Sequence, residues 1–467
     1  MPEPVRRKYL ERYAEPEARF GRQLGHQYAA AVVVPAHGEA PTFIDDLEPA
    51  LLAASGRVLV VVVVNGTDAS SDLVHDANAR LLGALSQRLV ARQDLTAVDG
   101  SPAVAALGRP SAYDLLVLDR ASPGRRLPPG EGVGLARRIG TDLALAHYDN
   151  GGVISPWLCA TDADARLPLD YFARLAALAQ QPLAADGTRR VGLSLPFWHY
   201  PSGDPAVDEA TALYELSLRY YTLGLASAGS PYAYQSMGSS LAALADAYAE
   251  VRGFPKRQAG EDFYLLDKLA KVGSIHRPAG DPILLRSRTS DRVPFGTGSR
   301  VRDILGDDGK LLFYHPRTFE LLGLTLRALR RAVLGRSEEL VVAELGRGDH
   351  QLDVGTVGAI STALEELQAF EALRETLGAS PDARVRERRL LTWFDALRTL
   401  RFIHLVEAPA GLPRVPFHEA LAGAPFCSFW APGMSVEACR TAASAAEQTL
   451  PLDIGVGSAF SGGVKTS

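Results

Sequence analysis

Two short runs of β-branched residues, at positions 31–34 and 58–64, stand out in the N-terminal part of the chain. Because these runs are continuously apolar and do not alternate with polar residues, they are typical of strands buried on both faces of a parallel sheet. Between them, over residues 42–54, apolar side chains recur at helical spacing. The pattern therefore predicts a βαβ unit.

The same alternation continues beyond this unit. Helical spacing over residues 72–92 is followed by apolar, strand-like runs at 115–118 and 156–161. Helices and strands then alternate to about residue 270. This order predicts an α/β domain whose mostly parallel sheet is flanked by helices.

The pattern changes in the last third of the chain, where strand-like runs become rare. Helical spacing at 319–334, 360–377 and 385–405 predicts a helical C-terminal region, and the last residues are rich in Gly and Ser. We expect an N-terminal extension (1–28), an α/β domain (29–305), a helical domain (306–454) and a flexible tail (455–467).

The composition narrows the class of protein. With 467 residues, of which 47% are hydrophobic, the chain can bury a large core without disulfides. A net charge of −5 does not favour nucleic-acid binding, which usually needs a basic surface. The three cysteines form neither a disulfide framework nor a Cys-x-x-Cys metal pair, which suits reduced thiols. Because no apolar run is long enough to cross a bilayer, and because residues 1–20 lack the apolar region of a signal peptide, we expect a soluble, cytoplasmic protein.

Polar residues follow each predicted strand, at the sheet edge where α/β proteins bind ligands. The sharpest of these segments is Asp162-Ala163-Asp164, directly after a buried strand. Its carboxylates are hard oxygen ligands that suit Mg²⁺ or Mn²⁺, with substrate phosphates and water completing the coordination. The plainer alternative is a strand-to-helix turn capped by Asp164.

A second acidic pair, Glu261-Asp262, opens a predicted amphipathic helix. Acids in a first helical turn often do no more than complement the helix dipole. Upstream, however, lie two glycine-containing segments, Gly238-Ser239-Ser240 and Gly253-Phe254-Pro255. These segments lie between the acids at 162–164 and the pair at 261–262, and we therefore consider all the motifs together.

From about residue 29 to about residue 300, the chain resembles the family 2 glycosyltransferases of the GT-A fold. Each motif is weak alone, but their order and spacing together are specific. One departure lies after Asn65, where Gly66 stands in place of the acid that often follows. The matching segments are 33–39 (Val-Val-Pro-Ala-His-Gly-Glu), 64–68 (Val-Asn-Gly-Thr-Asp), 132–137 (Gly-Val-Gly-Leu-Ala-Arg), 161–164 (Thr-Asp-Ala-Asp), 238–240, 253–255 and 260–262 (Gly-Glu-Asp).

The resemblance implies transfer of a sugar from a nucleotide-diphosphate-sugar donor to an acceptor hydroxyl, with inversion. A Mg²⁺ or Mn²⁺ ion would bind at Asp164 and Asp162, Asp262 would be the general base, and Glu261 would orient neighbouring hydrogen-bond donors or the acceptor. The acceptor side would include Trp198 and His199. The implied donor-binding residues are Pro35, His37, Glu39, Asn65, Asp162, Arg137, Arg288 and Arg292.

Other functions remain open. A retaining GT-A enzyme of the glycosylglycerate-synthase type would not need Asp262 as a base. A nucleotidyltransferase would also hold Mg²⁺ beside a parallel sheet, and a degenerate GT-A domain would act only as a scaffold. The basic amphipathic helix at 319–334 is compatible with contact to an anionic membrane and with packing inside its own domain.

Overall fold

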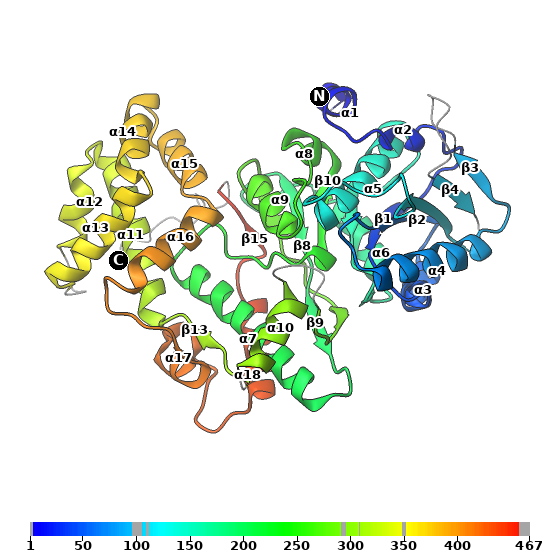
Figure 1. Cartoon of the computed structure of the whole chain (residues 1–467). Helices are drawn as coiled ribbons and strands as arrows, with labels where there is room; N and C mark the ends of the chain where they lie inside the picture. The colour runs from blue at the N-terminus through cyan, green and yellow to red at the C-terminus, as the bar shows by residue number, and fades with distance from the viewer. Residues whose placement is uncertain are drawn as a thin grey trace. The chain divides into compact units, whose positions relative to one another are not determined.

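The computed structural model describes residues 3–95, 105–108, 112–290, 296–307, 309–347 and 352–456. The chain divides into two compact units (Figure 1). Unit 1 contains Met1–Ser202 and Ser236–Ser299, and unit 2 contains Gly203–Gln235 and Arg300–Ser467. The chain thus leaves unit 1 once, returns to it, and ends in unit 2.

Unit 1 is built on a large mixed sheet with the strand order β11-β8-β10-β6-β1-β2-β5-β4-β3. Of these strands, β10 and β4 run antiparallel to their neighbours and the others share one direction. The predicted α/β class is confirmed, and the two reversed strands make the sheet mixed. The strands are β1 (Ala30–Ala36), β2 (Val58–Asn65), β3 (Gln93–Leu95), β4 (Ala105–Gly108), β5 (Asp114–Arg120), β6 (Trp157–Ala160), β8 (Arg190–Ser194), β10 (Leu241–Leu244) and β11 (Ser274–His276).

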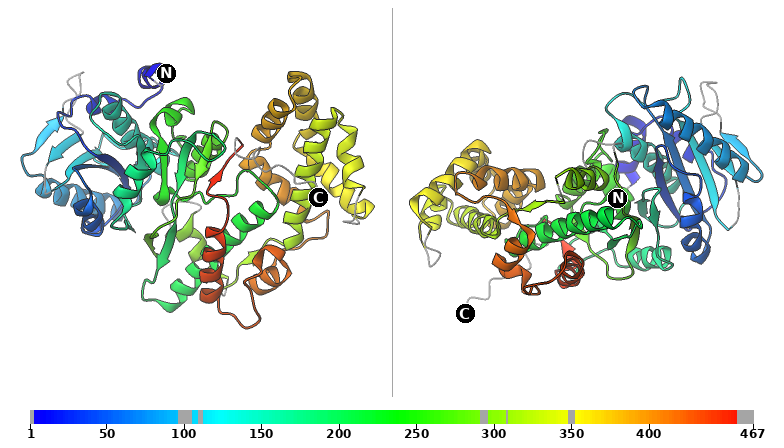
Figure 2. Two further views of the ribbon diagram at one scale, coloured as in Figure 1. Left: turned by 180° about the vertical axis from the view of Figure 1, so that it is seen from behind. Right: turned by 60° about the horizontal axis from the view of Figure 1, so that its bottom comes forward.

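Helices cover both faces of this sheet (Figure 2). Every residue of β1 and β2 is buried, as their continuous apolar runs require. Helix α5 packs on β1, β2 and β6. The helix can approach β1 closely because residue 140 is a glycine. A methyl group there would lie only 2.4 Å from Val33 Cγ1. The helices of unit 1 are α1 (Glu3–Arg12), α2 (Ala18–Gly21), α3 (Phe43–Ala53), α4 (Asp72–Arg88), α5 (Gly132–Asp149), α6 (Tyr171–Ala179), α8 (Ala245–Glu250) and α9 (Glu261–Ala270), with a 3₁₀ turn at Gly238–Ser240.

The strand order reverses between β1 and β6. From β1 the chain steps through β2 to β5 on one side, and α5 then carries it back to β6 on the other side of β1. Right-handed crossovers place α3 and α4 on one face and α5 on the opposite face. The carboxyl ends of β1 and β6 therefore flank a topological switch point, where α/β proteins usually bind their ligands.

A smaller sheet in unit 1 has the order β7-β12-β9, with β7 (Ala165–Arg166), β12 (Ile283–Arg286) and β9 (Phe197–Tyr200). Strand β7 begins directly after Asp164. It pairs antiparallel with β12, and Leu285 lies opposite Ala165. The residues that follow β12 are thereby brought beside the turn that contains Asp164.

The segment predicted as an N-terminal extension is part of unit 1. The Tyr9 hydroxyl on α1 donates to Asp142 Oδ1 at 2.7 Å, and the Tyr248 hydroxyl donates to the same oxygen at 2.9 Å. The Glu15 backbone N–H donates to Asp142 Oδ2 at 2.8 Å. Burial raises the pKa of Asp142 to about 6, so the carboxylate is ionised at neutral pH. The N-terminal segment is held by hydrogen bonds to a buried charge.

Replacing Tyr9 by Phe should therefore destabilise the protein by about 1–3 kcal/mol at pH 8, because a buried carboxylate loses a charged hydrogen bond. The loss should be smaller at pH 5, where Asp142 is largely protonated. Urea unfolding at the two pH values measures both. Tyr13→Phe is the control, since Tyr13 contacts Tyr9 and Arg252 through its ring. Equal losses in the two variants would contradict the assignment.

Unit 2 is mainly helical. Its helix α7 (Pro205–Ser227) packs against α18 (Val436–Gln448), and buried Arg219 on α7 pairs with Glu447 on α18 at 2.7 Å. The segment 203–235 lies inside the predicted α/β domain but belongs to unit 2, because its partners come from the end of the chain. The other elements are α11 (Pro316–Gly335), α12 (Glu339–Leu345), α13 (Val354–Glu366), α14 (Ala369–Ala379), α15 (Ala383–Trp393), α16 (Ala396–Glu407), α17 (Phe417–Gly423), a 3₁₀ turn (Pro425–Cys427), β13 (Leu312–Phe313), β14 (Val415–Pro416) and β15 (Asp453–Ile454), while α10 (Thr297–Gly306) begins in unit 1.

Helix α11 contains the basic amphipathic segment considered for membrane contact. Its apolar stripe, which includes Leu322, Leu326 and Leu329, is buried, whereas Arg327 and Arg331 are exposed. The helix packs against α12, α14, α15 and α16. The stripe is thus used for packing inside unit 2.

Across the described ranges, none of the helices combines the length and hydrophobicity that crossing a bilayer requires.

Candidate functional site

The carboxyl end of β1 leads into a turn that buried amides hold in place. Asn78 on α4 donates from Nδ2 to the Asn65 carbonyl at 2.9 Å and accepts from the Gly38 N–H at 2.8 Å. His37 Nδ1 donates to the same Asn65 carbonyl at 2.9 Å. The Asn65 side chain donates to the Ala36 carbonyl at 3.1 Å. These bonds join the ends of β1 and β2 and fix where the next residues emerge.

Two predicted donor-binding residues therefore have backbone partners here. Asn65 is buried and bonds to carbonyl groups, and Pro35 lies within β1 opposite Val63. His37 and Glu39 follow the strand and are half-buried. Asn78 was not anticipated, although a fully buried Asn in a helix is itself a sign that its amide has a fixed task.

Arg137 on α5 joins the two acidic motifs. Its guanidinium pairs with Asp162 after β6 and with Glu261 at the start of α9. The Arg137 and Glu261 side chains are 4% and 3% exposed. Burial lowers the pKa of Arg137, but the charges of Asp162, Glu261 and Asp262 outweigh that effect, and the pKa is raised. The acids predicted separately at 162 and 261 thus lie in one cluster, which we call the Arg137 cluster: Arg137, Asp162, Glu261 and Asp262.

Gly238 explains how so large a cation fits. A methyl group on Gly238 would lie only 2.0 Å from Arg137 Nη1, so a glycine is needed there. Close to it, among the described residues, the buried hydroxyls of Ser239 and Thr161 and the Nε of Arg137 have no hydrogen-bond partner. Buried hydrogen-bonding groups in and beside the Arg137 cluster are thus without a partner within the described part of the chain.

Asp262 lies in the first turn of α9, after Gly260, whose φ of +74° favours glycine. Its Oδ1 accepts from the Phe263 N–H at 2.7 Å, and its side chain is half-buried. Burial raises the pKa of Asp262 and raises that of Glu261 to about 7. A carboxylate with a raised pKa is better suited to accept a proton near neutral pH.

Asp164 has a different partner. The Arg288 Nε donates to Asp164 Oδ2 at 2.5 Å, because the β7–β12 pairing brings the residues after β12 beside this turn. Burial lowers the pKa of Arg288, but the charges of Asp164 and Glu39 outweigh that effect and raise it. Arg288 thus lies in the field of acids that follow both β1 and β6, at the switch point.

The predicted acceptor residues lie on β9. His199 is buried and packs edge-on against Phe197 with ring centroids 5.7 Å apart, whereas Trp198 is half-buried. Successive side chains of a strand point to opposite faces, so the two residues do not share one surface. Arg292, predicted to bind the donor, lies outside the described residues.

The carboxylate oxygens of Asp162 and Asp164 are hard ligands of the kind that divalent cations such as Mg²⁺ and Mn²⁺ prefer. No group of three or more His, Cys, Asp or Glu side chains placed to hold a metal occurs in the described part of the chain. Mg²⁺ is nevertheless commonly bound by one or two carboxylates together with substrate phosphates and water. Both carboxylates are partly exposed, at 34% for Asp162 and 19% for Asp164. Two hard-oxygen ligands after one strand fit such a cation.

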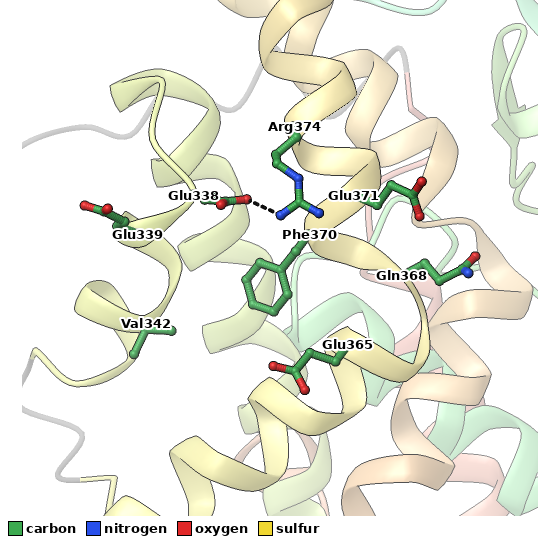
Figure 3. Close-up of a pocket in the computed structure, with 8 residues that line it drawn as sticks. All are labelled: Glu338, Glu339, Val342, Glu365, Gln368, Phe370, Glu371 and Arg374. Atoms are coloured by element: carbon green, nitrogen blue, oxygen red, sulfur yellow. Dashed lines mark hydrogen bonds and ion pairs between the residues drawn. The ribbon is translucent and has the colours of Figure 1, made fainter.

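A cavity of about 540 Å³ in unit 2 lies among α12, α13 and α14 (Figure 3). One of its acids, Glu338, accepts from Arg374 at 3.0 Å. The four glutamates would repel a diphosphate, so this cavity is not a candidate donor site. It is lined by Glu338, Glu339, Val342, Glu365, Gln368, Phe370, Glu371 and Arg374.

Among solved structures, the chain is similar to a mannosyltransferase from Pyrobaculum calidifontis in complex with GDP-Man and Mn²⁺. The identity is 15% and the TM-score 0.31, over 86% of this chain and 99% of that chain. No protein-family profile matches the sequence, and no curated protein matches it.

Proposed function

We propose that the protein is a glycosyltransferase of the GT-A type, similar to family 2, that transfers a sugar from a nucleotide-diphosphate-sugar donor to an acceptor hydroxyl with inversion. The observation that carries the proposal is the Arg137 cluster. Its acids come from the end of β6 and the start of α9, and one buried arginine joins them beside the switch point of the sheet. Acids gathered at such an edge are typical of catalytic sites, and burial raises the pKa of both Glu261 and Asp262.

The switch point supports binding of the donor. Arg288 offers a cationic group there, and arginine binds phosphate oxygens with two parallel hydrogen bonds. His37 and Glu39 follow β1 at the same edge, and in this proposal they contact the nucleoside. A divalent cation held by Asp164, with Asp162 beside it, would supply Lewis-acid neutralisation of the charge that develops on the leaving diphosphate.

Asp262 supplies the base in this proposal. The acceptor oxygen attacks the anomeric carbon from the face opposite the diphosphate, its proton passes to the Asp262 carboxylate, and the bond from the anomeric carbon to the diphosphate oxygen breaks. Glu261, fixed by Arg137, holds the first turn of α9 in place and so orients its neighbour Asp262. NMR of the product anomer tests the stereochemistry, since a retained configuration would exclude this role of Asp262.

A thermal-shift panel of UDP-, GDP- and dTDP-sugars, each with Mn²⁺ or Mg²⁺, tests the function. At about 100 times its Kd, a ligand stabilises the folded protein by about 2.7 kcal/mol, which raises the Tm by several degrees. We expect such a shift with one nucleotide class. If no nucleotide-sugar stabilises the protein with either cation, the proposal is wrong and a scaffold role is favoured.

Replacing Asp164 by Asn should remove the cation-dependent part of that shift, because the variant keeps the shape of the side chain but loses its charge. Asp170→Asn is a matched control, since Asp170 lies in the same unit and pairs with Arg174 at an exposed position. A cation-dependent shift that persists in Asp164→Asn would show that the cation is held elsewhere.

A further inference from the structure

The two acids of the Asp162-Ala163-Asp164 turn have arginine partners of different kinds. Asp162 pairs with Arg137, which is almost fully buried and also bound to Glu261. Arg137 therefore cannot leave Asp162 without leaving Glu261 unpaired in the interior, which is costly. This pair is fixed.

Arg288 is not held in this way. Its side chain is 35% exposed and it follows β12, outside the hydrogen-bonded strand. The Arg288–Asp164 pair is more exposed than the Arg137–Glu261 pair, so moving the Arg288 guanidinium away costs less than breaking the pairs of Arg137. Asp164 is consequently the acid of this turn whose counter-ion can be exchanged.

A metal and Arg288 compete for the same carboxylate. Mg²⁺ binds carboxylate oxygens at about 2.0–2.1 Å, and the Arg288 Nε already lies 2.5 Å from Asp164 Oδ2. A doubly charged ion bound to this carboxylate would lie next to the guanidinium that is bound to the same carboxylate. The two positive charges would then repel each other strongly.

We propose that Arg288 is an internal counter-ion of Asp164 that a divalent cation must displace, and that the released guanidinium then binds the diphosphate of the donor. The second half of this inference rests on the function proposed above. The first half concerns the cation alone. Arg288 thereby makes cation binding weak until a diphosphate is present to take up the guanidinium, which couples the two ligands.

Binding of Mn²⁺ alone, followed by electron paramagnetic resonance of the free ion, tests the first half. Arg288→Gln should bind Mn²⁺ about tenfold more tightly than the unchanged protein. The matched control is Arg286→Gln, which removes the same charge from an exposed side chain two residues earlier. It should change the affinity less than twofold. Asp164→Asn combined with Arg288→Gln should abolish the tight binding.

Equal Mn²⁺ affinities in Arg288→Gln and Arg286→Gln would overturn the inference, as would weaker binding or none in Arg288→Gln. The second half is tested with GDP and UDP. The unchanged protein should bind one of them at least tenfold more tightly with Mn²⁺ present, and Arg288→Gln should lose most of this coupling. Coupling that is unchanged in Arg288→Gln would overturn the second half. A Mn²⁺ result as expected, together with no nucleotide binding at all, would leave the competition standing and reject the proposed function.

Discussion

Replacing Asp262 by Asn should lower kcat by about 10²–10⁴-fold, the usual contribution of a general base, while donor and cation binding stay unchanged. The side chain keeps its shape and loses only the ability to accept the proton of the acceptor hydroxyl. Its contact with the Phe263 N–H can be kept by the remaining carbonyl oxygen. Single-turnover kinetics with the donor identified by thermal shift measure the effect.

The pH dependence gives an independent test of the same residue. Burial raises the pKa of Asp262, so the base becomes protonated, and the rate falls, at a higher pH than for an ordinary aspartate. Glu261, whose burial raises its pKa to about 7, also takes up a proton as the pH falls. We expect kcat/KM to rise with pH as the Asp262 carboxyl ionises, and the rise to be absent in Asp262→Asn.

Asp267→Asn is the matched control, because Asp267 lies on the same helix and pairs with Lys271 at 2.8 Å, away from the Arg137 cluster. It should retain nearly full activity. A loss of the same size in both variants would mean that the helix, and not the carboxylate at 262, is what catalysis needs. Loss of donor binding in Asp262→Asn would also contradict its assignment as a base.

The second large effect is on stability. Arg137→Met should destabilise the protein by about 3–5 kcal/mol, because Asp162 and Glu261 lose the buried cation that neutralises them. The stability of Arg137→Lys should lie between those of the unchanged protein and Arg137→Met, since one ammonium group cannot replace a planar guanidinium that bonds two carboxylates. The loss in Arg137→Met should be smaller at pH 5 than at pH 8, because Glu261 takes up a proton below its raised pKa of about 7.

Urea unfolding followed by circular dichroism measures these losses. The control is Arg166→Met, which breaks an exposed pair with Asp46 and should cost no more than about 1 kcal/mol. If Arg137→Met behaves like Arg166→Met, the Arg137 cluster is not what holds the two acidic motifs together.

Local patterns in the sequence were sufficient for the central elements. The runs at 31–34 and 58–64 lie in β1 and β2. A continuous apolar run identifies a fully buried strand from the local sequence alone, without knowledge of the strands beside it. The direction of β10 was not predictable, since its residues look alike in a parallel or an antiparallel strand. The place of α7 depends on a helix near the end of the chain, and local periodicity does not reveal such a partner.

The candidate site shows the same division. The motifs singled out Asp162 and the pair Glu261-Asp262 as separate candidates, and the structure joins Asp162 and Glu261 through Arg137. The pairing of Asp164 with Arg288 follows from the register of β7 on β12, which arises from two strands far apart in sequence. Asn78 was missed because its task is to bond backbone groups of other elements, and no sequence motif marks that.

The discontinuity of unit 2 has a consequence for synthesis on the ribosome. Helix α7 is synthesised early, but the partner of its Arg219, Glu447, lies 228 residues further along the chain, so this ion pair forms only late in synthesis. Until then its buried charges lack part of their compensation, so unit 2 cannot complete its fold before the C-terminal helix has been made. Unit 1, whose last segment ends at Ser299, can fold first while α7 remains as an insert that awaits its partner. A chain that stops shortly after Ser299 would therefore carry an unpartnered helix, and isolating unit 1 requires replacing residues 203–235 by a short linker.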